Sequence, residues 1–503
     1  MQILTAAQIR EADRITIEKE PVSSLNLMER AASKCFDWFN TNISKETPIV
    51  IICGRGNNGG DGLALSRMLY SAGFETKTIV LQFDSTLSDD CKTNLERLQK
   101  IDSRLVEVVI NNFNFPKLKP ETLLVDAIFG TGLSRNLDGV FGEVVKKMNE
   151  SGRPMISIDL PSGIRSDESS LIANNEIIKA KITLTFQYPK MALLVGENAP
   201  FYGKVVILDI GLLPDAIPAS EVKDQLVDES DIQQIFKPKW EFSHKGNFGH
   251  ALLITGEKGK MGAAILAAGG FLRSGGGLLT LLVPDEGINI VQTAVPEAMV
   301  WIRDENASAS FLPDLEKYTV VGMGPGTGMS TSTTQLLKKL IESSKRPLVL
   351  DADALNILAA HPEWISSLPP DSILTPHPGE FKRLAGEWKN DFEKLKMQRE
   401  FAQKNKIYLV LKGKNTSVAC PDGKMFFNPT GNAGMAKGGS GDVLTGLLTG
   451  ILASGYSPEE TCILGTYLHG LAGDLAATKL TKEAMKAGDL IDFLPTAWKK
   501  IIG

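Results

Sequence analysis

At 503 residues, the chain is too long for one ordinary domain and is expected to form two or three, each with its own core. The net charge of -5 comes from interspersed acidic and basic residues, and no apolar run reaches the roughly 18 residues of a membrane helix, so neither nucleic acid nor membrane is an expected partner. The five cysteines lack CxxC or metal-binding spacing, and the N-terminus lacks a signal-like apolar region, which together predict free thiols in the cytoplasm.

The N-terminal region begins with two helical patterns over residues 1 to 46, whose apolar stripe indicates core packing or a dimer contact. The apolar run Pro48 to Cys53 then predicts a strand buried on both faces. A Gly-rich stretch, GRGNNGGDG, separates this strand from a helix predicted over Leu63 to Ala72. This order is that of a nucleotide-binding crossover, although the spacing matches neither a dinucleotide fingerprint nor a P-loop. Asn57, Asn58 and Asp61 supply hydrogen-bonding groups that a tight turn would not require.

Strand-like runs continue to alternate with helical patterns up to residue 210. The predicted strands are Thr76 to Leu81, Leu105 to Ile110, Leu123 to Ile128, Met155 to Leu160, Ile182 to Phe186 and Val205 to Ile210. This alternation predicts a Rossmann-like, three-layer α/β domain over residues 1 to 215, with a doubly wound parallel sheet. Ligands of such a sheet bind beyond the carboxyl ends of its strands.

Polar residues follow two of these strands directly. Asp126 ends LLVD and Asp159 ends ISID, with Ser162 close behind in LPSG. A single Asp at a strand end is also explained as a loop cap, but several such ends favour a shared site. We therefore expect these residues to converge with the polar groups of GRGNNGGDG.

Residues 216 to 239 are predicted to be a linker, because prolines and scattered acids replace the strand alternation. A second α/β domain is predicted over residues 240 to 503, with a helix of small residues from Gly262 to Arg273. Its predicted strands are His250 to Thr255, Leu278 to Val283, Val320 to Met323, Leu348 to Leu350, Ile373 to Leu374 and Ile407 to Leu411, followed by a hairpin around Pro421 to Gly423.

The segment Asn428 to Gly450 combines a Gly-rich loop with apolar residues at helical spacing. Backbone N–H groups at such a helix N-terminus favour an anion such as phosphate. Asp442 would be repelled by that phosphate unless it removes a proton from the hydroxyl that attacks it. The alternative is an ordinary loop in which Asp442 caps the helix.

Taken together, these motifs resemble a known pair of enzymes. The C-terminal half resembles the ribokinase-like ADP/ATP-dependent NAD(P)H-hydrate dehydratases through VGMGPGTG, DADALN, TPHPGE, KGKNT and GGSGDVLTG. The N-terminal half resembles the NAD(P)H-hydrate epimerases through GRGNNGGDG, DAIFGTGLSR and DLPSG. The order of the two halves is that of the fused bacterial repair enzymes. The expected small-molecule partners are hydrated NADH, hydrated NADPH and ADP. A homo-oligomer such as a tetramer is also expected.

For the dehydratase half, the resemblance implies that ADP phosphorylates the hydroxyl of the hydrated nicotinamide ring, giving AMP, and that phosphate is then eliminated. We assign Asp442 as the base, and we expect Mg²⁺ to accompany the nucleotide. The expected nucleotide-binding residues are Lys412, Gly413, Lys414, Asn415, Thr416, Gly438, Gly439, Ser440 and Gly441. The expected hydrate-binding residues are Gly262, Ala263, Gly324, Gly326, His377 and Asp442. His469, within a helical pattern, is interpreted as a core histidine.

For the epimerase half, loss of hydroxide from the ring would give a planar cation that water attacks from either face, and Asp159 is our candidate for the acid–base group. The resemblance implies K⁺ bound by Asn58, Asp126 and Ser162. The expected substrate-binding residues are Asn57, Asn58, Gly59, Gly60, Asp61, Gly130, Thr131, Gly132, Leu133, Ser134, Arg135, Asn136 and Asp159. Two alternatives stay open: a vitamin or sugar kinase in the C-terminal half, and a non-catalytic binding module in the N-terminal half.

Overall fold

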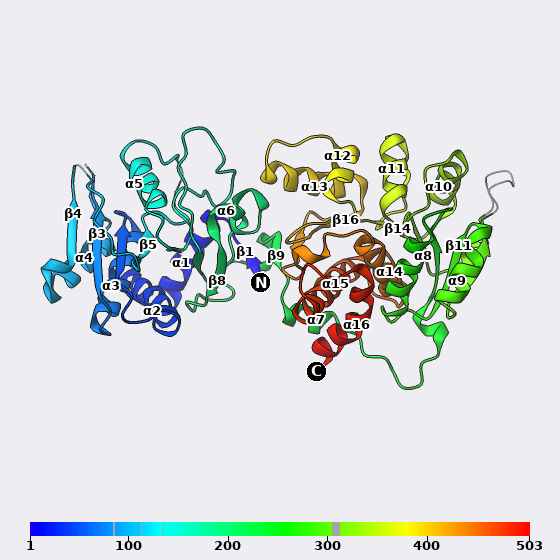
Figure 1. The fold of residues 1–503 in the computed structure, drawn as a ribbon, viewed down its shortest axis with the longest axis horizontal. Coiled ribbons are helices and arrows are strands. Elements are labelled where there is room, and N and C mark those ends of the chain that lie inside the picture. Colours follow the sequence, from blue (N-terminus) through cyan, green and yellow to red (C-terminus); the bar gives the residue numbers. More distant parts are fainter. Residues whose placement is uncertain (84–85, 112, 134, 304–311) are drawn as a thin grey trace. The chain divides into compact units, whose positions relative to one another are not determined.

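The computed structural model describes residues 1–83, 86–111, 113–133, 135–303 and 312–503. The chain divides into two compact units (Figure 1). The first unit comprises Met1–Val222 with Asn390–Phe392, and the second comprises Lys223–Lys389 with Glu393–Gly503. Among the helices of the described residues, none combines the length and hydrophobicity needed to cross a bilayer.

The elements of the first unit alternate between strands and helices, as the sequence predicted. They are β1 (Gln2–Ile3), α1 (Ala6–Lys19), α2 (Ser24–Asn42), β2 (Ile49–Cys53), α3 (Asn57–Ser71), β3 (Thr76–Leu81), α4 (Asp89–Ile101), β4 (Val106–Val109), β5 (Leu123–Ala127), α5 (Gly139–Glu150), β6 (Met155–Ile158), β7 (Ile182–Phe186), α6 (Ala199–Tyr202) and β8 (Lys204–Leu208). Strands β2 to β8 form a parallel sheet in the order β4-β3-β2-β5-β6-β7-β8.

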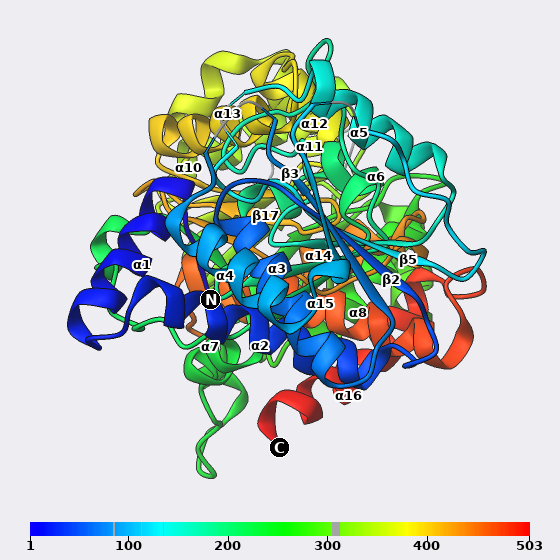
Figure 2. The same cartoon turned by 90° about the vertical axis from the view of Figure 1, so that its left-hand side faces the viewer.

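Helices cover both faces of this sheet. Alternate residues of β2 point to opposite sides: Ile51 packs with α2, α3 and α4, whereas Val50 and Ile52 pack with α5. Figure 2 shows α2, α3 and α4 side by side. The polar side chains that follow β2, β5 and β6 therefore lie at one edge, where the strands end.

The Gly-rich stretch after β2 departs from the prediction. Helix α3 begins at Asn57, six residues before the predicted start at Leu63, so most of the expected loop is the first turn of the helix. A side chain at Gly59 would bring its Cβ within 1.9 Å of the Gly54 backbone oxygen, and one at Gly62 would meet Ala127 at 2.6 Å. These glycines therefore allow α3 to pack closely on the ends of β2 and β5.

The second unit starts earlier than expected, because the segment predicted as a linker contains a strand and a helix. Its elements are β9 (Asp224–Leu226), α7 (Glu229–Ile235), β10 (His250–Ile254), α8 (Met261–Leu272), β11 (Leu278–Val283), α9 (Ile288–Ala294), β12 (Met299–Ile302), β13 (Val320–Met323), α10 (Thr331–Ser343), β14 (Leu348–Leu350), α11 (Ala352–Ala360), β15 (Ile373–Leu374), α12 (Pro378–Ala385), α13 (Asp391–Asn405), β16 (Tyr408–Leu411), β17 (Ser417–Ala419), β18 (Met425–Phe427), α14 (Ser440–Ala453), α15 (Pro458–Leu480) and α16 (Ala487–Ile502). Strand β9 pairs with β18, and Ile232 of α7 is buried in the core.

The sheet of the second unit runs in the order β9-β18-β17-β16-β15-β14-β13-β10-β11-β12. Strands β10 to β16 pair in parallel with their neighbours, and β17 forms antiparallel ladders with β16 and β18. Figure 1 shows α10, α11, α12 and α13 on one side of the sheet and α14, α15 and α16 on the other. Helices α8 and α14 pack very closely, because Gly446 lies directly against the backbone of Ala267. This contact fixes the N-terminus of α14 at the ends of the parallel strands.

Candidate active sites

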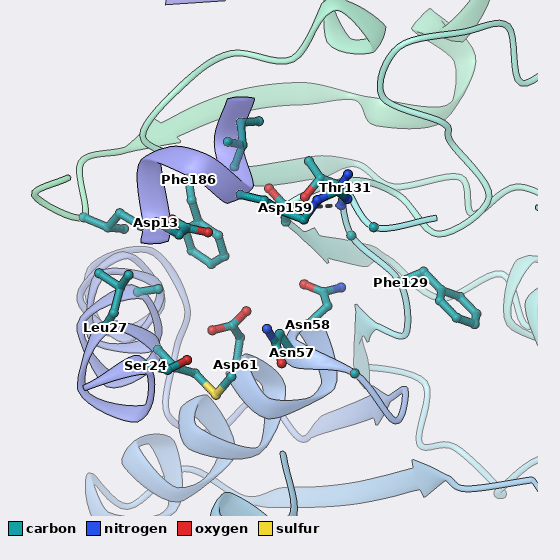
Figure 3. A pocket seen from close by; sticks show the side chains of 18 of the residues that line it. Asp13, Ser24, Leu27, Asn57, Asn58, Asp61, Phe129, Thr131, Asp159 and Phe186 are labelled. Atoms are coloured by element: carbon teal, nitrogen blue, oxygen red, sulfur yellow. Dashed lines mark hydrogen bonds between the residues drawn. The ribbon is translucent and has the colours of Figure 1, made fainter. Parts of the chain in front are cut away.

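The first unit contains a cavity of about 610 Å³ at the ends of β5 and β6, beside the N-terminus of α3 (Figure 3). It brings together eight of the residues predicted for the epimerase site: Asn57, Asn58, Asp61, Gly130, Thr131, Gly132, Leu133 and Asp159. Helices α1 and α2 supply further lining residues, including Asp13 and Leu27. The cavity is thus bounded by the sheet edge and by the two N-terminal helices.

Asp159 is held firmly on the wall of this cavity. Lys190 Nζ lies 2.8 Å from Asp159 Oδ1, and the backbone N–H of Thr131 donates to Asp159 Oδ2 at 2.9 Å. Lys190 is only 1% exposed and also donates to Thr185 Oγ1 and the Phe186 carbonyl. Asp159 itself adopts a left-handed backbone conformation with φ of 66°, which costs a non-glycine residue energy. Both carboxylate oxygens of Asp159 therefore have partners on the cavity wall.

Two further carboxyl groups line the same cavity. Burial raises the pKa of Asp13 to about 6, assisted by repulsion from Asp159 and opposed by Lys190. Burial also raises the pKa of Asp61 well above its ordinary value, with repulsion from Asp159, Asp13 and Asp90 adding to the effect. In Figure 3, Asp61 rises from α3 on the opposite side of the cavity from Asp159. Burial therefore disfavours the ionised forms of both Asp13 and Asp61 in this cavity.

Asp126 lies behind the cavity and is completely buried. Its carboxylate accepts hydrogen bonds from the hydroxyl groups of Ser162, at 2.5 Å, and Ser157, at 2.8 Å, and from the backbone N–H groups of Ser162 and Ile128. Burial still raises its pKa, although these hydrogen bonds act in the opposite direction. Nearby, both polar atoms of the Asn58 amide are buried without a hydrogen-bond partner among the described residues. Such a group requires a polar or ionic ligand.

The other residues predicted for this site lie elsewhere. Gly59 and Gly60 are inside α3, where Gly60 faces Met28 and Cys91. Arg135 does not line the cavity, and Asn136 bonds instead to the Ala173 carbonyl and to Arg165. Ser134 lies outside the described residues.

Sequence reasoning missed Asp13 and Lys190. The signal for Lys190 was a lysine shortly after the predicted strand Ile182 to Phe186, but nothing in the sequence linked it to Asp159. Asp13 lies within a helical pattern that gave no sign of facing a cavity.

The second unit contains a cavity of about 750 Å³ around the N-terminus of α14. It is lined by ten residues predicted for the dehydratase site: His377, Lys412, Gly413, Lys414, Thr416, Gly438, Gly439, Ser440, Gly441 and Asp442. Helix α14 begins after Gly439, whose φ of 96° is in the left-handed region. The glycines therefore leave the first backbone N–H groups of the helix open to a ligand, as expected of an anion site.

Asp442 lies in the first turn of α14, close to a buried ionic network. Lys412 donates to Asp351 Oδ1 at 2.7 Å, and the Thr445 hydroxyl donates to Asp351 Oδ2 at 2.7 Å. Burial raises the pKa of Asp442 from its ordinary value of 3.8 to about 7, with repulsion from Asp351 adding to the shift and Lys412 opposing it. This pKa is suited to a general base near neutral pH.

Two histidines also line this cavity. His469 donates from Nε2 to the Ser440 carbonyl at 2.9 Å, and burial lowers its pKa to about 4. It was interpreted as a core histidine, and it is buried, but it also supports the first turn of α14. His377 caps α12 by accepting from the backbone N–H groups of Gly379 and Glu380. Its side chain is 52% exposed, so its other ring nitrogen remains accessible at the cavity edge.

Five predicted residues do not line this cavity. Gly262 and Ala263 begin α8, and Gly326 packs against Ala263, with 3.0 Å between an added Cβ and the Ala263 Cβ. Gly324, with φ of 137°, lies against the Asp351 backbone, where an added Cβ would be 1.7 Å from the carbonyl oxygen. Gly324 thus packs against the backbone of Asp351, whose side chain is paired with Lys412. The fifth residue, Asn415, lies in the turn between β16 and β17 with φ of 55°.

Two doubly wound units, each with a polar cavity at the ends of its strands, define a two-domain α/β enzyme. The second cavity has the features of a phosphoryl-transfer site. Comparisons with known proteins agree with this description. The family model for NAD(P)H-hydrate dehydratase matches residues 251–496, and the model for the YjeF-related protein N-terminus matches residues 24–192.

Similar proteins cover the whole chain. A bifunctional NAD(P)H-hydrate repair enzyme from Moorella thermoacetica is 35% identical over 512 residues, covering 98% of this chain and 96% of its own. The chain belongs to the family of bifunctional NAD(P)H-hydrate repair enzymes. It therefore combines an N-terminal epimerase domain with a C-terminal ADP-dependent dehydratase domain, and the alternative of a vitamin or sugar kinase is not supported.

Solved structures confirm the ribokinase-like fold of the C-terminal half. The ADP/ATP-dependent NAD(P)H-hydrate dehydratase from Bacillus subtilis, crystallised with ATP and Mg²⁺, is 32% identical with a TM-score of 0.50, covering 55% of this chain and 98% of its own. A ribokinase-like protein from Enterococcus faecalis is 29% identical with a TM-score of 0.50, covering 56% and 96% of the two chains.

Proposed function

We propose that the two cavities carry out the two steps of NAD(P)H-hydrate repair. The cavity at α14 dehydrates the S hydrate with ADP, giving AMP and phosphate, and the cavity at α3 interconverts the R and S hydrates. The observation that carries this proposal is Asp442, a carboxyl group with a pKa of about 7 among the open N–H groups of a helix N-terminus. A base and an anion cradle together suit phosphoryl transfer to a hydroxyl.

In the dehydratase site, Asp442 removes the proton from the ring hydroxyl. The hydroxyl oxygen of the substrate attacks the terminal phosphorus of ADP, and AMP leaves. The N–H groups at the start of α14 stabilise the negative charge on the transferring phosphoryl group. The ring nitrogen then expels phosphate, and loss of a proton from the adjacent carbon restores the dihydronicotinamide. Lys412 and Lys414 add positive charge on the nucleotide side of the cavity.

Mg²⁺ fits the carboxyl group of Asp351, which lines this cavity. Asp351 supplies carboxylate oxygens of the kind that Mg²⁺ prefers and would hold the ion, which leaves Asp442 free to act as the base. Mg²⁺ would supply positive charge to the phosphate groups of the nucleotide.

In the epimerase site, we propose that K⁺ binds Asn58, Asp126 and Ser162. The unpartnered Asn58 amide and the buried charge of Asp126 support this assignment, because a hard cation prefers oxygen ligands and would offset the cost of burial. The ion would supply charge compensation beneath the loops that carry Thr131 and Asp159. Replacing KCl by NaCl should lower the melting temperature of the first unit, and no change would contradict the assignment.

The test of the proposed function uses a mixture of hydrate epimers incubated with ADP or ATP and followed at the dihydronicotinamide absorbance. Wild-type protein should convert the whole mixture faster than spontaneous epimerisation allows. Release of AMP from ADP in step with the absorbance identifies the donor. Failure to restore any absorbance would refute the proposal for the second unit.

We also propose a cytoplasmic homo-oligomer, such as a tetramer. The described cysteines are all buried free thiols, which supports a reducing compartment. Light scattering at several protein concentrations tests the assembly.

A further inference from the structure

The epimerase cavity presents two carboxyl groups on opposite sides. Asp159 lies at the end of β6 and Asp61 on the first turns of α3, and Figure 3 shows open space between their side chains. A flat nicotinamide ring bound in this space would have one carboxyl group facing each of its faces. Epimerisation needs proton transfer on both faces, because hydroxide leaves from one and water adds to the other.

The two carboxyl groups have opposite electrostatic surroundings. Asp159 forms an ion pair with the buried Lys190 and accepts a backbone hydrogen bond from Thr131, so both of its oxygens have partners. Asp61 has no ion pair or hydrogen bond within the described part of the chain. It shares its side of the cavity with Leu27 and Met28 of α2, whose apolar side chains disfavour an anion.

We propose that Asp61 and Asp159 form a two-carboxyl catalytic pair, in which the neutral Asp61 protonates the departing hydroxyl on one face and the ionised Asp159 deprotonates the water that attacks the other face. This inference rests on the epimerase function proposed above and adds Asp61 to it as a catalytic residue.

The step balances in atoms and charge. Asp61 gives its proton to the departing hydroxyl as the C–O bond on the Asp61 face breaks. Water is released, and a planar cation stabilised by the ring nitrogen remains. A second water forms a new C–O bond on the Asp159 face and gives its proton to Asp159. The enzyme then holds neutral Asp159 and ionised Asp61, which is the state required for the reverse direction or for reset by solvent.

The test measures epimerisation and solvent ¹⁸O exchange separately, each starting from a pure epimer in H₂¹⁸O and each corrected for the uncatalysed rate. In Asp61→Asn, epimerisation should fall about 100-fold or more in both directions, the usual size of a lost acid–base group. Exchange should survive only in the epimer whose hydroxyl faces Asp159. Once solvent has protonated Asp159, this carboxyl group gives its proton to the departing hydroxyl and takes one back from the water that returns on the same face. In Asp159→Asn, the surviving exchange should occur in the other epimer.

Asp90→Asn is the matched control. Asp90 lies near Asp61 and bonds to Ser24, but it does not line the cavity, so epimerisation should stay within about three-fold of wild type. The dehydratase activity of each variant reports on the folding of the rest of the chain. Should Asp61→Asn not fold, the exchange pattern of Asp159→Asn still decides the case.

Three results would overturn the inference. Asp61→Asn could epimerise at the wild-type rate, or Asp159→Asn could lose exchange in both epimers alike. If Asp13→Asn lost epimerisation and Asp61→Asn retained it, the role of proton donor to the departing hydroxyl would belong to Asp13 instead. Failure of the wild-type protein to epimerise either pure hydrate would refute the proposed function itself, and that result is distinct from all three.

Discussion

Replacing Asp442 by asparagine tests the chemistry of the dehydratase site most directly. The substitution keeps the size of the side chain and the N–H groups of α14 but removes the base. Turnover should fall about 10² to 10⁴-fold, whereas ADP should bind within about three-fold of wild type, because Lys412 and Lys414 remain.

The pH dependence gives a second measure of the same group. A base works only when ionised, so with a pKa of about 7 the wild-type rate should fall about ten-fold for each pH unit below neutrality and level off above about pH 8. Asp442→Asn should lose this dependence. Asp353→Asn is the control, because Asp353 adds only a small repulsion on Asp442 and does not line the cavity. The plateau rate of this variant should equal that of wild type.

Stability should change in the opposite direction to activity. The folded pKa of Asp442 lies above its ordinary value of 3.8, so ionising this carboxyl group destabilises the fold as pH rises from about 4 to 7. At about 1.4 kcal/mol for each pH unit, the upper limit is about 4 kcal/mol, and solvent in the cavity reduces it. Asp442→Asn should therefore melt at a higher temperature than wild type at pH 8 and at an equal temperature at pH 4.

Turnover assays over pH 5 to 9 and calorimetry over pH 4 to 9 would follow the two quantities. Turnover of Asp442→Asn within ten-fold of wild type, or an unchanged pH midpoint in this variant, would refute the assignment of Asp442 as the base. A lower melting temperature at pH 8 would contradict the electrostatic part of the reasoning.

Three further predictions follow from other contacts. Asp351→Asn should move the midpoint of the dehydratase pH profile to lower pH, because it removes the main repulsion on the base; an unmoved midpoint contradicts this. Lys190→Met should leave Asp159 buried without its cation and so impair epimerisation, which gives biphasic progress curves with mixed epimers. Monophasic curves that match wild type would contradict this prediction. Gly446→Ala would place a methyl 1.8 Å from a backbone oxygen and should lower stability by about 3 kcal/mol in calorimetry. Gly488→Ala should not, because a methyl at this half-buried position would meet only Lys486, at 3.8 Å.

The sequence was a good guide to the strands of both sheets, because parallel strands buried on both faces are short, nearly continuous apolar runs. Strand β12 was missed, since Met299 and Trp301 are exposed and the run is less clearly bounded. The start of α3 was wrong because glycines were interpreted as loop residues, whereas here they serve close packing of a helix. The strand β9 was hidden in a proline-rich segment, and its pairing with β18 is set by tertiary contacts.

The candidate sites were predictable to the extent that their residues lie at strand ends or in Gly-rich turns. Asp159 and Asp442 both came from such positions, and the structure places each in a cavity. Their partners were not predictable. Lys190 forms an ion pair with Asp159 between separate loops. Lys412 and Asp351 follow β16 and β14, which are separated by β15 in the sheet, so only the fold brings each pair together.

The two sites share one electrostatic arrangement. In each cavity a lysine pairs with one aspartate, Lys190 with Asp159 and Lys412 with Asp351, while a second carboxyl group lies nearby without such a partner. The pair holds one negative charge in place, and burial together with that charge raises the pKa of the second group, Asp61 or Asp442. In both sites the neutral form of an ordinary aspartate is thereby favoured, and for Asp442 the pKa reaches about 7. Because the effect depends on the charge of the paired aspartate and not on a particular ligand, neutralising either paired aspartate should lower the pKa of its neighbour in both sites.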